Sequence, residues 1–298
     1  MAGTIFYDAT RRTAVVLLVR FGEIALKSPY VRRQLRDRLV ANIQDLFAAE
    51  RAECLTRADH GRIYIEVNDV DAATRILRRA FGVVSFSPAE SCPPRLESIA
   101  GVAVGVARDR VNAGTTFAIR PRRSGSHTFT SQDVGRAVGA EVQRAVPGAV
   151  VDLDEPQVEI FVEVREGAGY VFTEIVAGPG GLPAGSQGAA LAVVEGTRGV
   201  VAAWMAMKRG CRLTVAALTE ELAEPLRRWD VHLKVLAYRP GDDLVAFLRI
   251  ARARGVFLGS SVDDLPGARS DLPVPVFHPT IGLGDGEVAE RLSSIVAA

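Results

Sequence analysis

Residues 191–203 read LAVVEGTRGVVAA, a pattern that predicts a hydrophobic strand, a short turn containing glycine and the start of a helix. In nucleotide-binding α/β domains, a turn in this position holds phosphate groups at the amino terminus of the helix. Phosphate binding needs small residues whose backbone amides converge, and a nearby carboxylate opposes it. Glu195 therefore disfavours a triphosphate at this turn, whereas Arg198 favours one. Taken alone, the turn is better explained as a plain connection between strand and helix.

The residues after this turn continue the alternation of short apolar strands and helices. We predict strands at 191–194, 212–218, 234–238, 256–258 and 274–277, and helices at 200–209, 219–227, 242–254 and 286–296. Such alternation is typical of a parallel sheet that helices cover on both faces. The sequence therefore predicts an α/β domain over residues 190–298.

A glycine- and proline-rich segment precedes this domain. Residues 178–188 read GPGGLPAGSQG and contain five glycines and two prolines, a composition that cannot hold a regular helix or strand. We therefore place a linker between domains at residues 178–189.

Residues 1–88 predict a small α+β unit. The expected elements are a strand at 14–20, a helix that starts after Ser28 and Pro29, a strand at 62–67, a helix ending at Gly82 and a strand at 83–86. This order fits a ferredoxin-like fold.

A second α+β unit is predicted over residues 89–177, after a Pro- and Ser-rich connection at 88–94. Its expected elements are a helix at 96–111, a strand at 116–120, a helix at 131–146 capped by Ser131, and a hairpin of strands at 158–164 and 170–176.

Composition narrows the classes of function. The chain has 298 residues and a formal net charge of +1, so a nucleic acid would have to bind a local basic patch. Its three cysteines are widely spaced and form no CxxC pair, so we expect no structural metal site and no disulfide framework. We also expect a cytoplasmic protein without membrane association, because no apolar run is long enough to span a bilayer and no signal peptide is evident.

Residues 120–130, RPRRSGSHTFT, form the first candidate site. Arginine presents a planar fork of donors that matches phosphate oxygens, and serine and threonine hydroxyls add neutral donors. His127 or Phe129 can stack on a nucleobase. The alternative is a solvated loop whose arginines pair with carboxylates, and composition alone favours that alternative.

The helix that follows Pro29 gives the second candidate, because Arg32, Arg33, Arg36 and Arg38 lie on it and Lys27 just before it. Such a run is usually the solvated side of an amphipathic helix. If it lay beside residues 120–130, the two segments would form one electropositive surface.

Several stretches resemble one protein family, the tRNA 4-thiouridine synthetases or tRNA sulfurtransferases, also called thiamine biosynthesis sulfur-transfer proteins. The stretches are RFGEIALK at 20–27, FAIRPRRSGSHTFTS at 117–131, VVDL at 150–153, VEVRE at 162–166 and GGLPAGSQG at 180–188. The resemblance implies a ferredoxin-like domain, a THUMP domain and a Rossmann-like PP-loop domain, shortened here, with tRNA as partner. It also implies RNA-binding roles for these residues: Arg120, Arg122, Arg123, Ser126, His127, Thr128, Lys27, Arg32 and Arg33.

In the third domain, the sequence lacks several motif residues of the family that it resembles. The family's phosphate loop, Ser-Gly-Gly-x-Asp-Ser, falls on residues 194–199, where only Gly196 is retained and Arg198 replaces the aspartate. The lysine expected before the last helix is Asp285, and a polar stretch upstream is reduced to residues 259–264. The family's later sulfur-handling cysteine has no counterpart. Gly196, Thr197, Arg198 and Gly199 are thus a degenerate nucleotide site, and no catalytic residue or metal ligand is assigned.

We therefore expect a tRNA-binding member of this family whose adenylation site is degenerate. It would act without catalysis or beside a separate catalytic or sulfur-carrier protein, and a homodimer is a further possibility. The alternatives are an active sulfurtransferase that uses ATP and Mg²⁺ to make 4-thiouridine with sulfur supplied in trans, and a sulfur-transfer role in thiamine thiazole formation.

Overall fold

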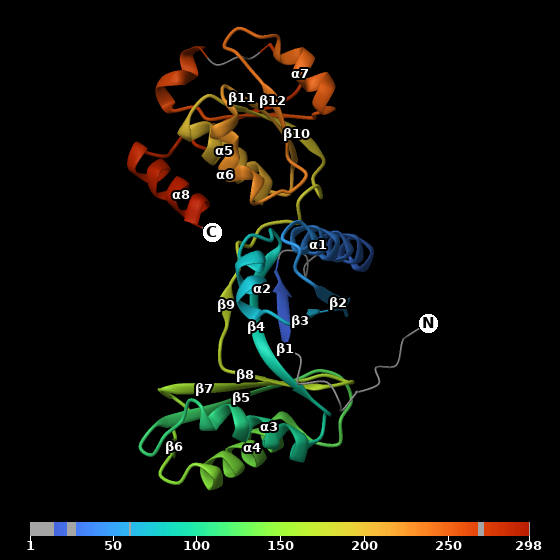
Figure 1. Ribbon diagram of the computed structural model, residues 1–298, viewed down its shortest axis with the longest axis vertical. Coiled ribbons are helices and arrows are strands. Elements are labelled where there is room, and N and C mark those ends of the chain that lie inside the picture. Colours follow the sequence, from blue (N-terminus) through green and yellow to red (C-terminus); the bar gives the residue numbers. More distant parts are fainter. Residues whose placement is uncertain (1–14, 23–27, 60, 268–270, 298) are drawn as a thin grey trace. The chain divides into compact units, whose positions relative to one another are not determined.

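The computed structural model describes residues 15–22, 28–59, 61–267 and 271–297 (Figure 1). The chain divides into two compact units. One contains residues 1–18, 64–70 and 86–176, and the other contains residues 19–63, 71–85 and 177–298. Within the described ranges, no helix is both long enough and apolar enough to cross a membrane.

The amino-terminal elements follow the order of a ferredoxin-like fold. They are β1 (Val15–Phe21), α1 (Pro29–Ala49), β2 (Cys54–Ala58), β3 (Ile63–Val67), α2 (Val70–Leu77) and β4 (Val83–Cys92). Two expectations for this region were wrong. The short strand β2 was missed because its side chains are exposed or half-buried and show no clear apolar alternation. The connection expected at 88–94 is largely strand, because β4 continues through Pro88 and pairs with β8 at residues 90–92.

The first unit is built on a mixed sheet in which β4, β8, β7, β5 and β6 are successive neighbours. Its strands are β5 (Thr116–Arg123), β6 (Val150–Val151), β7 (Val158–Val164) and β8 (Gly169–Phe172), with β9 (Val176–Ala177) following in the chain. The expected hairpin is confirmed, since β7 and β8 pair antiparallel, whereas β5 pairs parallel with β7. Helices α3 (Leu96–Arg108) and α4 (Ser131–Ala145) bury their apolar faces against β5 and β7, around Phe117 and Ile160.

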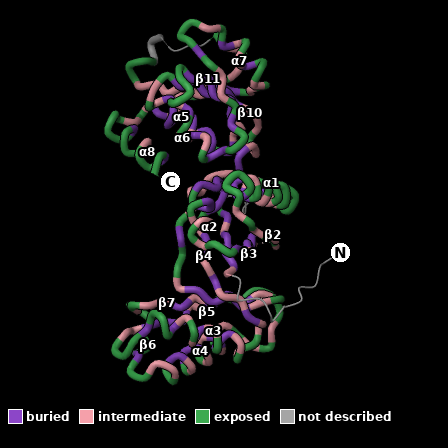
Figure 2. Tube along the Cα trace, in the orientation of Figure 1, coloured by how far each residue is buried: buried purple, intermediate pink, exposed green. Residues whose placement is uncertain are grey.

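The second unit contains the expected parallel sheet. Its strands are β10 (Ala189–Val194), β11 (Arg212–Ala217), β12 (Lys234–Ala237), β13 (Val256–Leu258) and β14 (Val276–Phe277), in the spatial order β12-β11-β10-β13-β14. Helices α5 (Thr197–Lys208), α6 (Glu220–Arg227) and α8 (Asp285–Ala297) pack on one face, and α7 (Leu244–Ala251) packs on the other. Strands β10 and β11 are therefore buried along most of their length (Figure 2).

The chain reverses its direction across this sheet next to β10. It proceeds from β10 to β11 and β12 on one side, and then returns to β13 and β14 on the other side. The loops that follow β10 and β13 therefore run in opposite directions from the carboxyl ends of these strands. Open α/β sheets bind their ligands at such a point. The turn at residues 195–199 lies at this point.

Residues 178–188, called the strap below, contain no helix or strand, as expected, yet they are fastened along their length. The amide of Gly180 donates to Val83 O at 2.8 Å, and that of Leu182 donates to Lys208 O at 3.0 Å. A Cβ on Gly181, whose φ is +75°, would lie 2.2 Å from Lys208 O. The glycines of the strap thus permit a close backbone approach that no side chain allows.

Replacing Gly181 with alanine should destabilise the protein more than the same change at Gly180. Both residues have positive φ, but a Cβ on Gly180 meets no atom within 4 Å. Both variants force alanine into a left-handed backbone conformation, which costs free energy. Only Gly181→Ala adds the collision with Lys208 O. We expect an additional loss of roughly 1–3 kcal/mol in the free energy of unfolding, measured with urea. Equal losses would show that the close approach does not constrain the fold.

Candidate functional sites

The arginines of residues 120–123 lie on a strand rather than in a loop, because β5 extends to Arg123. Strand alternation puts Arg120 and Arg122 on the face opposite Phe117, and so opposite the helices. Arg120 Nε donates to Glu159 Oε1 on β7 at 2.6 Å. Arg122 and Arg123 are exposed, and neither has a carboxylate partner in the described part of the chain. Pairing with carboxylates therefore accounts for Arg120 and not for the other two.

Residues 124–130 form an ordered turn between β5 and α4. The ring of His127 stacks on that of Phe129, with centroids 5.5 Å apart and planes inclined by 21°. His127 Nε2 lies 3.2 Å from the carbonyl oxygen of Ser124, while Ser126 and Thr128 are exposed. The two aromatic rings thus form one small stacked surface beside the exposed arginines.

The amino terminus of α4 is satisfied by its own side chains. Its cap is Thr130, not Ser131 as expected, and Thr130 Oγ1 accepts from the amide of Asp133 at 3.2 Å. Asp133 Oδ2 in turn accepts from the amide of Thr130 at 2.8 Å. Hydrogen bonds from Thr130 hold the pKa of Asp133 below its usual range. Because this carboxylate is charged and occupies the helix end, α4 offers no anion site there.

An apolar groove of about 540 Å³ runs between β5 and α4, on the face of β5 opposite Arg122. Its floor includes Ile119 and Pro121 of β5 and Leu153, and α4 contributes the two glycines Gly135 and Gly139. Polar side chains of Ser131, Gln132, Arg136 and Gln143 also line it. A flat ring with hydrogen-bonding edges suits such a surface.

The basic residues of α1 have mixed environments. Arg32 is half-buried, and Arg33 is exposed with its Nε 3.7 Å from Asp37 Oδ2. Arg36 Nη2 is 2.8 Å from Asp37 Oδ1, whereas Arg38 is exposed. Lys27 lies outside the described residues. That α1 and residues 120–130 form one electropositive surface stays a prediction.

Neighbouring backbone segments pack closely against the turn at residues 195–199. Gly196 is the N-cap of α5 with an extended backbone, and Glu195 is exposed. A Cβ on Gly199 would lie 2.8 Å from Val194 Cα, and one on Gly259 would lie 2.3 Å from the Gly199 nitrogen. The backbone that follows β13 therefore packs directly against the first turn of α5, and neither glycine leaves room for a side chain.

Arg198 forms an ion pair that sequence reasoning missed. Its Nη2 lies 2.7 Å from Asp285 Oδ1, and its Nη1 donates to the carbonyl oxygen of Thr280 at 3.2 Å. These two positions are aspartate and lysine in the family that the chain resembles. In this chain the residues at the two positions, 87 apart in the sequence, form one ion pair. Their opposite changes of charge were the signal that could have revealed the pair.

The other polar groups near this turn also satisfy one another. Ser260 Oγ and His278 Nδ1 are 2.9 Å apart, and Asp264 Oδ2 accepts from the amide of Ser261 at 2.7 Å. Hydrogen bonds from Ser261 lower the pKa of Asp264. Among the described residues, no group of three histidine, cysteine or acidic side chains is placed to hold a metal ion. Arg198 is thus engaged by Asp285 and Thr280, and Glu195 adds an exposed carboxylate to the same turn.

None of the cysteines has the character of an activated thiol. Burial raises the pKa of Cys92 to about 11, and the charge of Glu90 adds to the effect. Burial also raises the pKa of Cys54 and of Cys211. Since the thiolate is the nucleophile, these protonated thiols are poor carriers of sulfur.

Comparison with known proteins agrees with the domain order. The ThiI ferredoxin-like domain matches residues 16–87, and the THUMP domain matches residues 94–174. A probable tRNA sulfurtransferase of Methanosarcina mazei is 42% identical over an alignment covering 96% of this chain and 84% of that protein. Another, from Methanothermobacter thermautotrophicus, is 40% identical, and the alignment covers 70% of this chain but only 55% of that protein.

Two solved structures share the fold. PH1313 from Pyrococcus horikoshii Ot3 superposes with a TM-score of 0.83 at 26% identity, covering 94% of this chain and 99% of that one. A 4-thiouridine synthetase, solved as a complex with RNA and bound ATP, superposes with a TM-score of 0.76 at 20% identity and covers 95% of this chain and 85% of that one.

Reversing the charge at position 285 should destabilise the protein, and reversing both charges should restore part of the loss. Asp285→Lys places two cations together, whereas Arg198→Asp with Asp285→Lys re-forms the pair in the opposite sense. Because the Asp285 side chain is 98% exposed, we expect the single change to cost less than about 1 kcal/mol in urea unfolding. A double variant less stable than Asp285→Lys would contradict a direct interaction.

Proposed function

This chain belongs to the tRNA sulfurtransferase family, and we propose that it binds tRNA without adenylating it. The observation that carries the proposal is the Arg198–Asp285 ion pair at the turn where the family's loop binds phosphate. We retain the expected domains, namely a ferredoxin-like domain at 1–88, a THUMP domain at 89–177, a linker at 178–189 and a reduced PP-loop-like domain at 190–298. We place this role in the cytoplasm.

Exposed and unpaired charge supports the binding of RNA by the THUMP domain. Arg122 and Arg123 have no carboxylate to give up, so they can neutralise phosphates and release counterions at little cost. The stacked rings of His127 and Phe129 offer an aromatic face to an unpaired base, and the neighbouring groove can receive its ring. Ser126 and Thr128 supply neutral donors. Arg120, held by Glu159, orders the strand that presents these groups.

Two features argue against adenylation by this chain. A nucleotide would have to displace Asp285 from Arg198 and approach the carboxylate of Glu195. The backbone at Gly259 packs closely against Arg198 and Gly199, which leaves little room beside the first turn of α5. A separate feature argues against sulfur transfer, because the raised pKa of Cys92 leaves this thiol protonated at neutral pH. Losing donors aimed at a developing charge typically costs several kcal/mol of transition-state stabilisation.

The protein would then present tRNA to a separate catalytic or sulfur-carrier protein, or act by binding alone. Gly196, Thr197, Arg198 and Gly199 keep the strand-to-helix geometry of the ancestral loop but would serve the fold. A homodimer is compatible with either role.

The binding half of the proposal is tested with a tRNA transcript and fluorescence anisotropy over a range of KCl concentrations. We expect the double variant Arg122→Ala, Arg123→Ala to bind at least tenfold more weakly. Two lost phosphate contacts should also reduce the slope of log affinity against log salt by about 1.5. Arg110→Ala is the matched control, since Arg110 is exposed in the same unit and has no ion pair in the part of the chain described. An equal effect of both variants would overturn this assignment.

The catalytic half is tested by ATP–pyrophosphate exchange and by titration of ATP and Mg²⁺, each with and without tRNA. We expect no exchange and no saturable heat of binding in either condition. Robust exchange in the presence of tRNA would establish the rival function, an active sulfurtransferase whose sulfur is supplied in trans.

A further inference from the structure

Three arginines from separate segments of the second unit lie near the edge of the parallel sheet opposite the turn at 195–199. Arg38 lies on α1, Arg212 is the first residue of β11, and Arg254 immediately precedes the start of β13. The strap passes beside them at Gly185.

Arg38 and Arg212 converge on one point of the strap. A Cβ built on Gly185 would lie 3.4 Å from Arg38 Nη1, 3.3 Å from Arg212 Nε and 3.4 Å from Arg212 Nη2. Gly185 has a φ of +80°, a conformation that favours glycine, and a side chain there would press on both guanidinium groups. The backbone therefore leaves open the space that the two cations share.

Strand register brings Arg254 to the same edge. Arg212 is the partner of Ala189 on one side of β10, and the amide of Arg254 donates to Ala189 O at 2.9 Å on the other side. Arg212 and Arg254 thus flank the first residue of β10. The guanidinium of Arg212 reaches Asp230, next to Trp229 of the core that α5, α6 and α8 cover.

The cations in this cluster outnumber the carboxylates that neutralise them. Arg212 Nη1 is 3.3 Å from Asp230 Oδ1, an oxygen that also accepts from the amide of His232 at 3.0 Å. Asp45 Oδ2 is occupied by His232 Nε2 at 2.9 Å. Arg38 and Arg254 have no carboxylate partner among the residues described. Like charges brought together in this way favour an anion between them.

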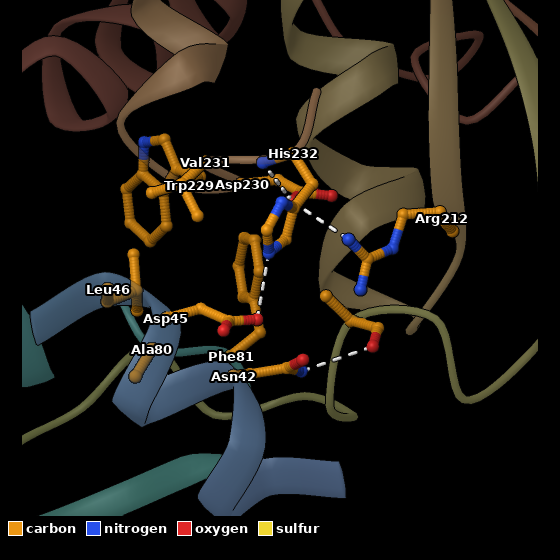
Figure 3. Close-up of a pocket in the computed structure, with 11 residues that line it drawn as sticks. Asn42, Asp45, Leu46, Ala80, Phe81, Arg212, Trp229, Asp230, Val231 and His232 are labelled. Carbon is orange, nitrogen blue, oxygen red and sulfur yellow. Dashed lines mark hydrogen bonds and ion pairs between the residues drawn. The ribbon is translucent and has the colours of Figure 1, made fainter. Parts of the chain in front are cut away.

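Side chains on the turns of α1 that follow Arg38 anchor this helix to other segments. Arg38, Asn42 and Asp45 follow one another at helical spacing, so they share a face of α1. Asn42 Nδ2 donates to the carbonyl oxygen of Ala184 at 3.1 Å, and Asp45 pairs with His232 (Figure 3). Nearby, Phe81 stacks on Trp229 with ring centroids 4.9 Å apart. This fastening preorganises Arg38 and reduces the entropy lost when a ligand binds.

The size of the neighbouring cavity limits the kind of ligand. The pocket that Asn42, Ala184 and Arg212 line has a volume of about 20 Å³, enough for a water molecule and far too small for a base or a nucleoside. Arg38 and Arg254 do not line this pocket and are exposed, so an anion that they bind would lie at the surface, like one phosphate group of a larger molecule.

We propose that Arg38, Arg212 and Arg254 bind the phosphodiester backbone of RNA. This inference rests on the proposed tRNA binding and extends it to the carboxy-terminal domain, which would hold RNA at the edge of its sheet opposite the degenerate turn. It also gives this domain a binding role that needs neither ATP nor a reactive thiol.

The test uses the full chain, a tRNA transcript and anisotropy measured against KCl concentration. Arg38→Ala and Arg254→Ala should each weaken binding about three- to tenfold and reduce the salt slope by about 0.7–0.9, the value of one phosphate contact. Arg291→Ala is the matched control, because Arg291 is exposed on α8 and has no ion pair in the described ranges. Arg212 is left unchanged because its pair with buried Asp230 supports the fold.

The outcomes separate this inference from the proposed function. If Arg122→Ala with Arg123→Ala weakens binding while Arg38→Ala and Arg254→Ala behave like Arg291→Ala, the inference is overturned and the THUMP contact stands. If the unaltered chain does not bind tRNA, both fail. Inorganic phosphate at equal ionic strength distinguishes a free anion from a backbone. Phosphate binding that depends on Arg38, without any change in tRNA affinity, would also overturn the inference.

Discussion

The backbone of the strap passes so close to two other segments that side chains are excluded, and the second unit depends on this contact. Gly178 lies against Val83, and Gly181 lies against the carbonyl oxygen of Lys208 at the end of α5. The strap thereby fastens the end of α2 and the start of β4 to the carboxy-terminal domain through backbone hydrogen bonds. Side-chain contacts such as Asp45–His232 and Phe81–Trp229 can form only because this spacing is fixed.

The carboxy-terminal domain has several internal polar contacts at the carboxyl edge of its sheet. Arg198 reaches Asp285 and Thr280, Ser260 meets His278, and Asp264 accepts from Ser261. A polar group that already has a partner must give up that interaction before it binds a ligand, so its net gain from a phosphate is small. Glu195 is exposed at the same turn, and its carboxylate opposes an anion near the amino terminus of α5.

Several exposed arginines, in contrast, have no carboxylate partner among the described residues. Arg122 and Arg123 project from the end of β5 without carboxylates, as Arg38 does from α1. Since the net charge of the chain is only +1, any attraction for a polyanion must come from local groups. In the function proposed above, these exposed arginines supply the phosphate contacts with which a nearly neutral chain would bind RNA.

The sequence by itself determined much of the secondary structure and the family. Apolar runs as short as Val256–Leu258 predicted the parallel sheet, and the glycines at 178–188 predicted the irregular segment, because both signals lie within a few residues of chain. Exposed β2, which lacks such a signal, was missed, and Pro88 concealed the continuation of β4. Tertiary structure alone decided that Arg198 meets Asp285, 87 residues away, and that Arg38 and Arg212 share the space above Gly185. Periodicity specifies which face of an element is buried, but a contact between distant side chains depends on the path that the whole chain takes between them.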